Sequence, residues 1–375
     1  MNRIYKLLKS LIPPLVSTLF LFIIVEIIMR LALGAPEGFF SFLQDAPRGG
    51  MYPREVTIVN KWGMIPYVVK TNQLGLRGDE LSENDLKLKK IVAIGDSFTD
   101  GFYVDNDATY THYLQEEIDE RLGRKYIVLN AARGGGSIDK EFSILKRVAL
   151  PLKPDIILFQ FCTNDIKDIA GRSLERLVKK GKTGFHRQDM HFKRYLTTWF
   201  ITRTAIGEVI YKAYWNRFVH PNPPTPVFDR TRYVIEGGDN TWENVALFNR
   251  KNRNSDGIVL REPFTAEAGR AIDIYCELFS LFADECKEHN VSLIFVYMPN
   301  YSQIYDESTS MKIRDVLYDK CKELRVKFLD LTPHFRREAK GKVLHLVPLD
   351  FHLNPEGNRV MAQGIYEFFA ENDLL

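Results

Sequence analysis

The stretch KKIVAIGDSFTDG, residues 89–101, joins an apolar run to a short polar segment. The run IVAI shows no alternation of apolar and polar positions, which is typical of a strand buried on both faces of a sheet. Gly95 ends the run and permits a sharp turn, so that Ser97 begins the segment after the strand. This order of strand, turn and polar residues predicts a buried parallel strand with a candidate functional residue at its carboxyl end.

Four further apolar runs repeat the pattern, at residues 125–130, 154–161, 291–299 and 326–331. Helical stretches lie between or after them, near 108–123, 137–149, 264–289, 308–324 and 355–370. Apolar strands that alternate with helices predict a parallel sheet covered on both faces. We therefore expect a doubly wound, flavodoxin-like α/β fold with five parallel strands, whose ligands bind at the carboxyl ends of the strands.

Segments with candidate catalytic residues follow three of these strands, and a fourth precedes the last helix. Ser97 can act as a nucleophile, because a hydroxyl next to a base attacks carbonyl carbons. The glycine run in VLNAARGGGS, residues 128–137, leaves backbone N–H groups available to a ligand but lacks the lysine of a phosphate loop. Asn164 can donate a side-chain N–H to an oxyanion. His352 has Asp350 two residues before it, and an aspartate commonly fixes the ring of a histidine base.

Each of these segments taken alone also has a structural interpretation. Ser97 is in a position to cap a helix, the glycines fit a tight turn, and Asn-Asp pairs are common in turns. His345 has no neighbour in the sequence that indicates a chemical role. The chemical interpretation rests on the occurrence of all four segments in one chain and in this order.

Together they resemble the SGNH (GDSL-type) hydrolases, a superfamily of esterases and lipases, whose blocks run G-D-S, Gly, G-x-N-D and D-x-x-H. The resemblance covers about residues 89–165 and 290–372. It implies Ser97 as nucleophile and His352 as base, with an oxyanion hole formed by the N–H groups of Ser97 and Gly135 and the side chain of Asn164. Gly135 is chosen because Asn130 aligns with the N-x-x-x-x-G run of the second block. No metal and no cofactor are implied.

The sequence departs from the family pattern at two places. Cys162 stands where the third block usually has glycine, and a side chain there can crowd the oxyanion loop. Leu349 occupies the aspartate position of D-x-x-H, so that Asp350 gives D-x-H instead. We keep Asp350 as the expected partner of His352.

The N-terminus predicts a membrane anchor. Arg3, Lys6 and Lys9 precede an apolar run, residues 11–33, and about 23 helical residues span roughly 34 Å, enough for the hydrocarbon core. The basic flank should stay inside, which predicts a single-pass protein of the bacterial cell membrane with an extracytoplasmic catalytic domain. A glutamate and an arginine late in the anchor, followed by TNQLGLRGDE at 71–80, resemble bacterial membrane-anchored members of the superfamily. A cleaved signal peptide ending at Gly34 is the alternative.

We expect an anchor at 1–35, a cover segment with short strands at 36–88, and a hydrolase domain at 89–375 with a helical insertion at about 166–262. A long aromatic helix is predicted at 192–218 in the insertion. Its spacing of apolar residues fits packing on the main domain, a substrate lid, or contact with a membrane surface. Glu26 and Arg30 of the anchor stand four residues apart and can pair on one helix face.

Composition narrows the function classes. With 45% apolar and 26% charged residues the chain can bury a core, and its net charge of +3 argues against a nucleic-acid partner. The four cysteines show no C-x-x-C spacing, so no zinc or redox motif is indicated. A Cys286–Cys321 disulfide and four buried thiols both remain possible.

The sequence thus predicts a serine-dependent ester hydrolase that acts on O-acyl esters of extracytoplasmic glycans or lipids. An O-acyltransferase of cell-envelope polysaccharide would use the same residues. A non-catalytic polysaccharide-binding protein would use the same cleft without turnover.

Overall fold

The computed structural model describes residues 2–33, 51–60, 67–183, 192–214, 258–346 and 350–375. These residues separate into two compact units. The smaller unit contains residues 2–33, 58–60 and 192–214, and the larger contains the other described residues.

The larger unit is built on a parallel sheet of five strands in the order β4-β3-β5-β6-β7. Its strands coincide with the five predicted apolar runs: β3 (Lys89–Ile94), β4 (Tyr126–Asn130), β5 (Ile156–Phe161), β6 (Ser292–Tyr297) and β7 (Lys327–Asp330). The order is the flavodoxin-like 2-1-3-4-5 order, whose switch point lies between the first and third strands of the sheet. The carboxyl ends of β3 and β5 therefore meet at the switch point.

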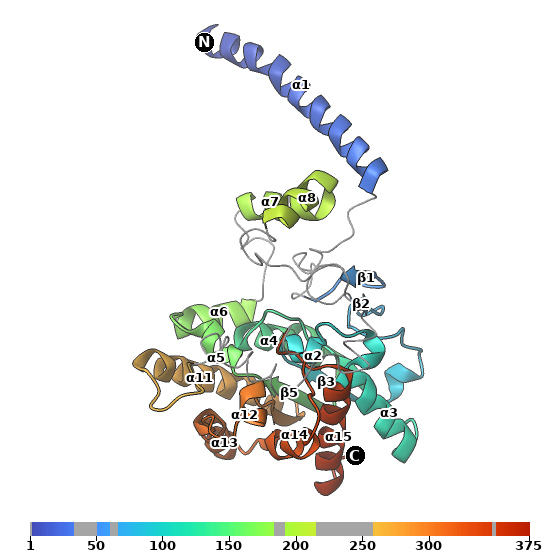
Figure 1. Cartoon of the computed structure of the whole chain (residues 1–375), viewed down its shortest axis with the longest axis vertical. Coiled ribbons are helices and arrows are strands. Elements are labelled where there is room, and N and C mark those ends of the chain that lie inside the picture. The colour runs from blue at the N-terminus through green and yellow to red at the C-terminus, as the bar shows by residue number, and fades with distance from the viewer. Residues whose placement is uncertain (1, 34–50, 61–66, 184–191, 215–257, 347–349) are drawn as a thin grey trace. The chain divides into compact units, whose positions relative to one another are not determined.

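Helices cover both faces of the sheet (Figure 1). Along β3, Val92 and Ile94 pack with α4, α11 and α13 on one face, and Ile91 and Ala93 pack with α3, α14 and α15 on the other. This alternation explains why the strand is apolar throughout, as a strand buried on both faces must be. The helices of this unit are α2 (Ser97–Asp100), α3 (Tyr110–Leu122), α4 (Ile138–Ile144), α5 (Asn164–Ile169), α6 (Leu174–Thr183), α11 (Ala266–Glu288), α12 (Tyr301–Tyr305), α13 (Lys312–Leu324), α14 (Thr332–Glu338) and α15 (Pro355–Glu371).

Short elements complete the described chain. A π turn (Leu145–Ala149) and a 3₁₀ turn (Leu150–Leu152) extend α4, and further 3₁₀ turns occur at Asp85–Lys87 and Asn106–Ala108. The strands β1 (Thr57–Asn60) and β2 (Tyr67–Lys70) lie where short strands were expected.

The four cysteines are free thiols. Cys162, Cys286 and Cys321 are buried, and burial raises the pKa of Cys286 to about 12. The interpretation as buried apolar side chains is therefore correct for Cys162, Cys286 and Cys321, whereas Cys276 is half-buried, and the Cys286–Cys321 disulfide is absent.

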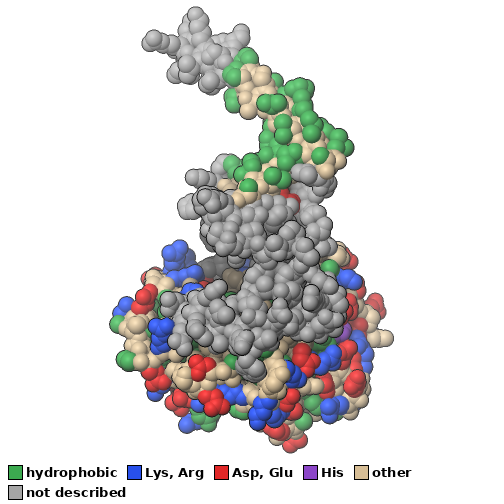
Figure 2. Space-filling view, viewed as in Figure 1, with side chains coloured by type: hydrophobic (Ala, Val, Ile, Leu, Met, Phe, Trp, Pro, Cys, Tyr) green, Lys and Arg blue, Asp and Glu red, His purple; other side chains and the backbone are tan. Residues whose placement is uncertain are grey.

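In the smaller unit, α1 (Asn2–Leu33) contains an apolar stretch, Ile12–Ala32, with mean hydropathy 2.3 and no buried residues. It is long and apolar enough to cross a membrane or to serve as a signal sequence. Figure 2 shows apolar side chains along the stretch Ile12–Ala32.

The prediction of one continuous helix at 192–218 is wrong about its continuity. The structure has two helices, α7 (Phe192–Arg203) and α8 (Ala205–Tyr214), and residues 215–218 lie outside the described residues. The break occurs at Thr204, whose hydroxyl accepts a hydrogen bond from the Gly207 N–H at 2.9 Å. A threonine that caps the next helix in this way interrupts the preceding one.

Candidate active site

Ser97 follows the sharp turn that ends β3. A Cβ atom at Gly95 would lie 2.5 Å from Thr99 Oγ1 and 2.6 Å from Gln160 Oε1, so only glycine fits this turn. Asp96 then caps α2 by accepting a hydrogen bond from the Phe98 N–H at 2.9 Å. Ser97 is thereby held as the first residue of α2, at the carboxyl end of β3.

The structure brings His352 to Ser97 across 255 residues of sequence. Nε2 of His352 lies 2.6 Å from Oγ of Ser97, within hydrogen-bond reach. On the opposite side of the ring, Nδ1 contacts Oδ1 of Asp350, and the His352 backbone N–H donates to the same oxygen at 2.9 Å. The D-x-H spacing therefore allows Asp350 to contact the imidazole directly.

Aromatic rings enclose the imidazole of His352. The ring centroids of Phe351, Phe98, Phe102 and Tyr103 lie 4.6, 4.9, 5.4 and 5.6 Å from that of His352. Ser97 is 8% exposed and His352 6% exposed. Because little water reaches these groups, electrostatic interactions between them are stronger than they would be at the surface.

Asn164 begins α5, directly after the strand β5 that neighbours β3. One of its Nδ2 hydrogens is donated to Oδ2 of Asp96 at 3.1 Å, which leaves the second available to a ligand. Burial raises the pKa of Asp96, and the hydrogen bonds from the Phe98 N–H and from Asn164 oppose that shift. Asp96 thus connects the Ser97 turn to the Asn164 side chain.

Gly135 lies in the loop after β4 with a φ of +71°, a conformation that favours glycine. The neighbouring Gly134 donates its N–H to Oδ2 of Asp100 at 2.8 Å. Asp100 belongs to α2, so this bond fixes the glycine loop to the helix that carries Ser97.

A family model named GDSL-like lipase/acylhydrolase matches residues 93–360, which include every described element of this site. The chain belongs to this family. Membership makes it a carboxylic ester hydrolase with the SGNH-type fold.

Solved structures with a similar fold include an acetyl xylan esterase, AlAXEase (13% identity, TM-score 0.41, covering 74% of this chain and 98% of that one). LAE5, an alpha/beta hydrolase from the metagenome of Lake Arreo in Spain, shares 12% identity with a TM-score of 0.41 over 76% and 96% of the chains. A catalytic mutant of an acetylxylan esterase from Geobacillus stearothermophilus shares 13% identity with a TM-score of 0.40 over 74% and 93%. These likenesses are too remote to inform substrate choice. No curated protein sequence matches the chain.

Two residues outside the family motifs, Arg77 and Tyr52, bind the helix and loop that carry Ser97. Arg77 is 4% exposed and donates from its guanidinium to the carbonyl oxygens of Asp100 at 2.5 Å, Gly101 at 2.7 Å and Val104 at 2.6 Å. Tyr52 donates its hydroxyl to Oδ2 of Asp100 at 2.9 Å. Arg77 falls within the TNQLGLRGDE stretch, but these three carbonyl partners are more than twenty residues away, so no local pattern reveals them.

The sequence departs from the family pattern at Cys162 and Leu349, and the structure describes the first of these. Cys162 is 2% exposed and packs in the buried cluster that includes Phe98 and Met298. Its N–H donates to Oδ2 of Asp165 at 3.1 Å. Leu349 lies outside the described residues.

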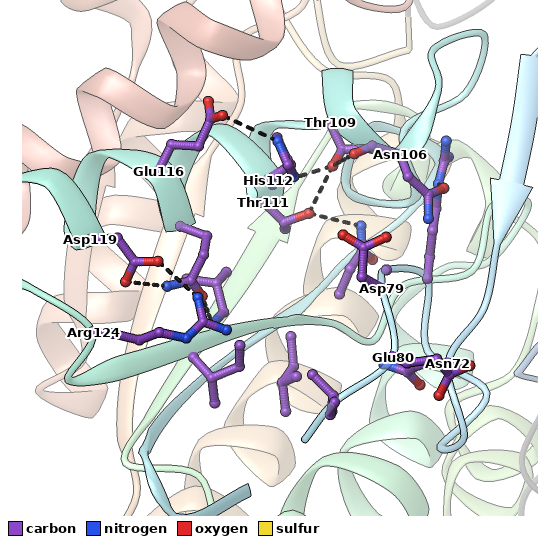
Figure 3. A pocket seen from close by; sticks show the side chains of 18 residues that line it. Asn72, Asp79, Glu80, Asn106, Thr109, Thr111, His112, Glu116, Asp119 and Arg124 are labelled. Carbon is purple, nitrogen blue, oxygen red and sulfur yellow. Dashed lines mark hydrogen bonds and ion pairs between the residues drawn. The ribbon is translucent and has the colours of Figure 1, made fainter. Parts of the chain in front are cut away.

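A separate pocket of about 250 Å³ lies between the segment 72–81, the edge strand β4 and α3 (Figure 3). Its wall contains an ion pair of Arg124 with Asp119 and a contact of 3.4 Å between Nε2 of His112 and Oε1 of Glu116. None of Ser97, Gly135, Asn164, Asp350 and His352 lines this pocket, so it is distinct from the candidate site.

Proposed function

We propose that the enzyme hydrolyses esters in two steps through an acyl group carried on Ser97. The observation that supports this most directly is the 2.6 Å contact between Ser97 Oγ and His352 Nε2. In the first step Nε2 takes the hydroxyl proton while Oγ forms a bond to the ester carbonyl carbon. The imidazolium then gives this proton to the leaving alcohol as the carbon–oxygen bond to the alcohol breaks.

Asp350 holds the imidazole in the orientation that this transfer needs. Its carboxylate accepts from Nδ1, which fixes the acceptor tautomer at Nε2 and stabilises the imidazolium. In the second step Nε2 deprotonates a water molecule, whose oxygen attacks the acyl carbon. The bond from that carbon to Oγ then breaks, and the imidazolium returns the proton to Oγ, which releases the acid and restores Ser97.

The negative charge on the carbonyl oxygen is held, in this proposal, by the N–H groups of Ser97 and Gly135 and by Nδ2 of Asn164. The free Nδ2 hydrogen of Asn164 supports its part, because Asp96 occupies only the other one. Loss of one such donor typically costs about 10²- to 10³-fold in kcat.

We infer that the substrates are O-acyl esters of extracytoplasmic glycans or lipids. This inference is supported by the apolar stretch Ile12–Ala32 and by the basic residues that precede it. A basic flank is retained on the cytoplasmic side, so that an uncleaved span leaves the catalytic residues outside the cell membrane.

The assignment is tested with the full chain in detergent. Wild type should hydrolyse a short-chain nitrophenyl ester and be labelled by a serine-directed fluorophosphonate. Ser97→Ala should lose labelling and about 10³-fold or more in kcat, while Ser280→Ala on α11 should keep both. Wild-type turnover in Ser97→Ala would exclude Ser97 as the nucleophile.

The substrate class is tested by product analysis. The enzyme is incubated separately with O-acetylated envelope polysaccharide and with a lysophospholipid, and the released acid is measured with and without added glycan acceptor. Release of free acid in the absence of an acceptor supports hydrolysis. Product that forms only as acylated acceptor would instead show that the enzyme transfers the acyl group.

A further inference from the structure

Two charged residues of the apolar helix α1 bind the turn between α7 and α8. Glu26 accepts the N–H of Ala205 on Oε1 at 2.9 Å and the N–H of Ile206 on Oε2 at 3.1 Å. Arg30 donates to the carbonyl oxygen of Arg203 at 2.7 Å and pairs with Glu26 at 2.6 Å. Glu26 therefore satisfies the first amides of α8, and Arg30 satisfies a terminal carbonyl of α7.

These contacts give the depth of the turn along α1. Glu26 stands six residues before Ala32, the end of the apolar stretch, which is about 9 Å at 1.5 Å per residue. The ring of Phe22, about 15 Å from that end, lies 6.1 Å from the ring of Phe200 in α7. If Ile12–Ala32 crosses a bilayer, the turn and the adjoining part of α7 lie level with the half of the span that follows Phe22.

The helix pair exposes apolar side chains at the same time. Leu196 and Trp199 of α7 are 45% and 49% exposed, and Val209 and Ile210 of α8 are 39% and 58% exposed. Figure 1 shows α8 beside the C-terminal end of α1, whose own apolar side chains are exposed as well. Exposed apolar surface of this kind is unfavourable in water and favourable among acyl chains.

The backbone groups at the turn have partners, and the exposed Arg203 that ends α7 has a long side chain of the kind that extends to the lipid headgroups. A helix pair satisfies its backbone internally except at its ends, and here Glu26, Arg30 and the Thr204 hydroxyl bind the end groups at the turn. Glu208 of α8 is 4% exposed, so its carboxylate does not belong to the apolar face. An ion pair within an apolar span is expensive unless it has such partners.

We propose that α7 and α8 form a hairpin inserted into the outer leaflet of the bilayer that α1 spans. Its face of Leu196, Trp199, Val209 and Ile210 contacts phospholipid acyl chains, and Glu26 with Arg30 binds its turn to α1. The proposal rests on the membrane anchoring proposed above. The occupant is lipid because these exposed apolar side chains belong to helices that contact α1 at Glu26 and Phe22, within its apolar stretch, where the side chains of α1 are exposed as well.

The test places an environment-sensitive fluorophore (NBD) on single cysteines in the full chain. Cys276, the one native cysteine that is not buried, is first replaced by serine. Ile210→Cys reports on the hairpin, Leu21→Cys on the anchor and Tyr318→Cys on the surface of the catalytic unit, all three positions being exposed. The protein is reconstituted in phosphatidylethanolamine/phosphatidylglycerol vesicles with or without lipids that carry a doxyl quencher on the acyl chain.

We expect a blue-shifted emission and quenching at positions 210 and 21, and neither at position 318. Quenching at 21 without quenching at 210 would overturn the hairpin insertion while leaving the anchor intact. Absence of quenching at 21 would overturn the anchoring itself. Equal quenching at 318 would also overturn the proposal, because contact would then not be specific to the hairpin.

The role of Glu26 is tested in the Ile210→Cys background. Glu26→Ala removes both acceptors for the α8 amides, whereas Glu26→Gln keeps one side-chain oxygen. Quenching at 210 should fall toward the level of position 318 in Glu26→Ala and be largely retained in Glu26→Gln. Unchanged quenching in Glu26→Ala would show that the carboxylate does not hold the hairpin at this depth.

Discussion

At the scale of the residue, Asp350 and His352 form a compact unit within three consecutive residues. The Oδ1 atom of Asp350 contacts both the Nδ1 atom and the backbone N–H of His352. A side chain that binds the backbone two residues later makes an Asx turn, which needs no help from distant parts of the chain. This local turn explains how an aspartate one position away from the family's usual place reaches the imidazole.

Replacing the carboxylate tests whether this turn serves chemistry. Asp350→Asn keeps an acceptor oxygen but offers an N–H₂ group that favours the wrong tautomer of His352. In serine proteases with a Ser-His-Asp triad, the same change lowers kcat by about 10⁴-fold. We expect a loss of about 10³- to 10⁴-fold in kcat here. The measurement is nitrophenyl ester turnover at constant folded fraction, checked by thermal unfolding. A loss below tenfold would mean that another group orients His352.

Glu141 is a second residue whose ionisation has consequences. It is 1% exposed, and neither of its carboxylate oxygens has a hydrogen-bond partner among the described residues. Burial, with the nearby charges of Asp96 and Asp139, raises the pKa of Glu141 well above its ordinary value of 4.5. Burial raises the pKa of Asp165 as well, but Asp165 accepts the Cys162 N–H. Glu141 is therefore the group that stays protonated more readily.

This shift gives stability a definite dependence on pH. Above pH 4.5 the unfolded chain loses the Glu141 proton while the folded chain keeps it, so the folded state binds more protons. The stabilising contribution is thus complete below pH 4.5 and is lost as pH rises through the folded pKa. The glutamine of Glu141→Gln cannot ionise. The melting temperature of this variant minus that of wild type should therefore increase as the pH rises from 5 to 8. Exposed Glu267→Gln is the control, and equal gains in both variants would contradict the explanation.

At the scale of the element, the segment before the first strand of the sheet supports the loop that carries Ser97. Arg77 reaches three carbonyl oxygens in residues 100–104, and Tyr52 and the Gly134 N–H bind the carboxylate of Asp100. The segment therefore holds α2 and the loop after it, and the glycine loop binds the same Asp100 carboxylate. A positioning role of this kind acts on the geometry of the site without contact with the reacting atoms.

Replacement of Arg77 separates this role from simple packing. Arg77→Met keeps an apolar stem but removes the guanidinium donors from three buried carbonyl oxygens, of which that of Gly101 still accepts the Val104 N–H. We expect a cost of about 3 kcal/mol in the free energy of unfolding. We also expect kcat/KM to fall about 10- to 100-fold, since small displacements misalign reacting groups. Arg77→Lys should recover part of the loss, because one ammonium cannot reproduce the planar fork. The exposed Arg124→Met should change stability by about 1 kcal/mol or less.

The same elements show what a sequence can and cannot predict. The five strands were predictable because burial on both faces requires continuous apolar runs. Ser97 and Asn164 follow two of these strands, and His352 precedes the last helix of the pattern. Arg77 and Tyr52 were not predictable, because their partners are set by tertiary folding. The break at Thr204 has a local sign, a hydroxyl three residues before Gly207, but the contacts of Glu26 with the next two amides are set by tertiary folding.

At the scale of the whole molecule, an ester hydrolase shares one chain with a helix that is apolar over Ile12–Ala32. A signal sequence and an anchor pass the same test of length and hydropathy. The Glu26–Arg30 pair favours the anchor, because a cleaved segment has no need of specific contacts with α8. Whether α1 is retained therefore decides between the anchor and the signal sequence.

The final prediction concerns retention and orientation of this helix. A chain tagged at both ends should give one membrane-bound species of 43.4 kDa plus the two tags. In spheroplasts, added protease should remove the C-terminal tag and leave the N-terminal one, because Arg3, Lys6 and Lys9 keep that end inside. Changing these three residues to glutamate should reduce the fraction with this orientation. A shorter species that carries only the C-terminal tag, free of the membrane, would show that α1 is a cleaved signal.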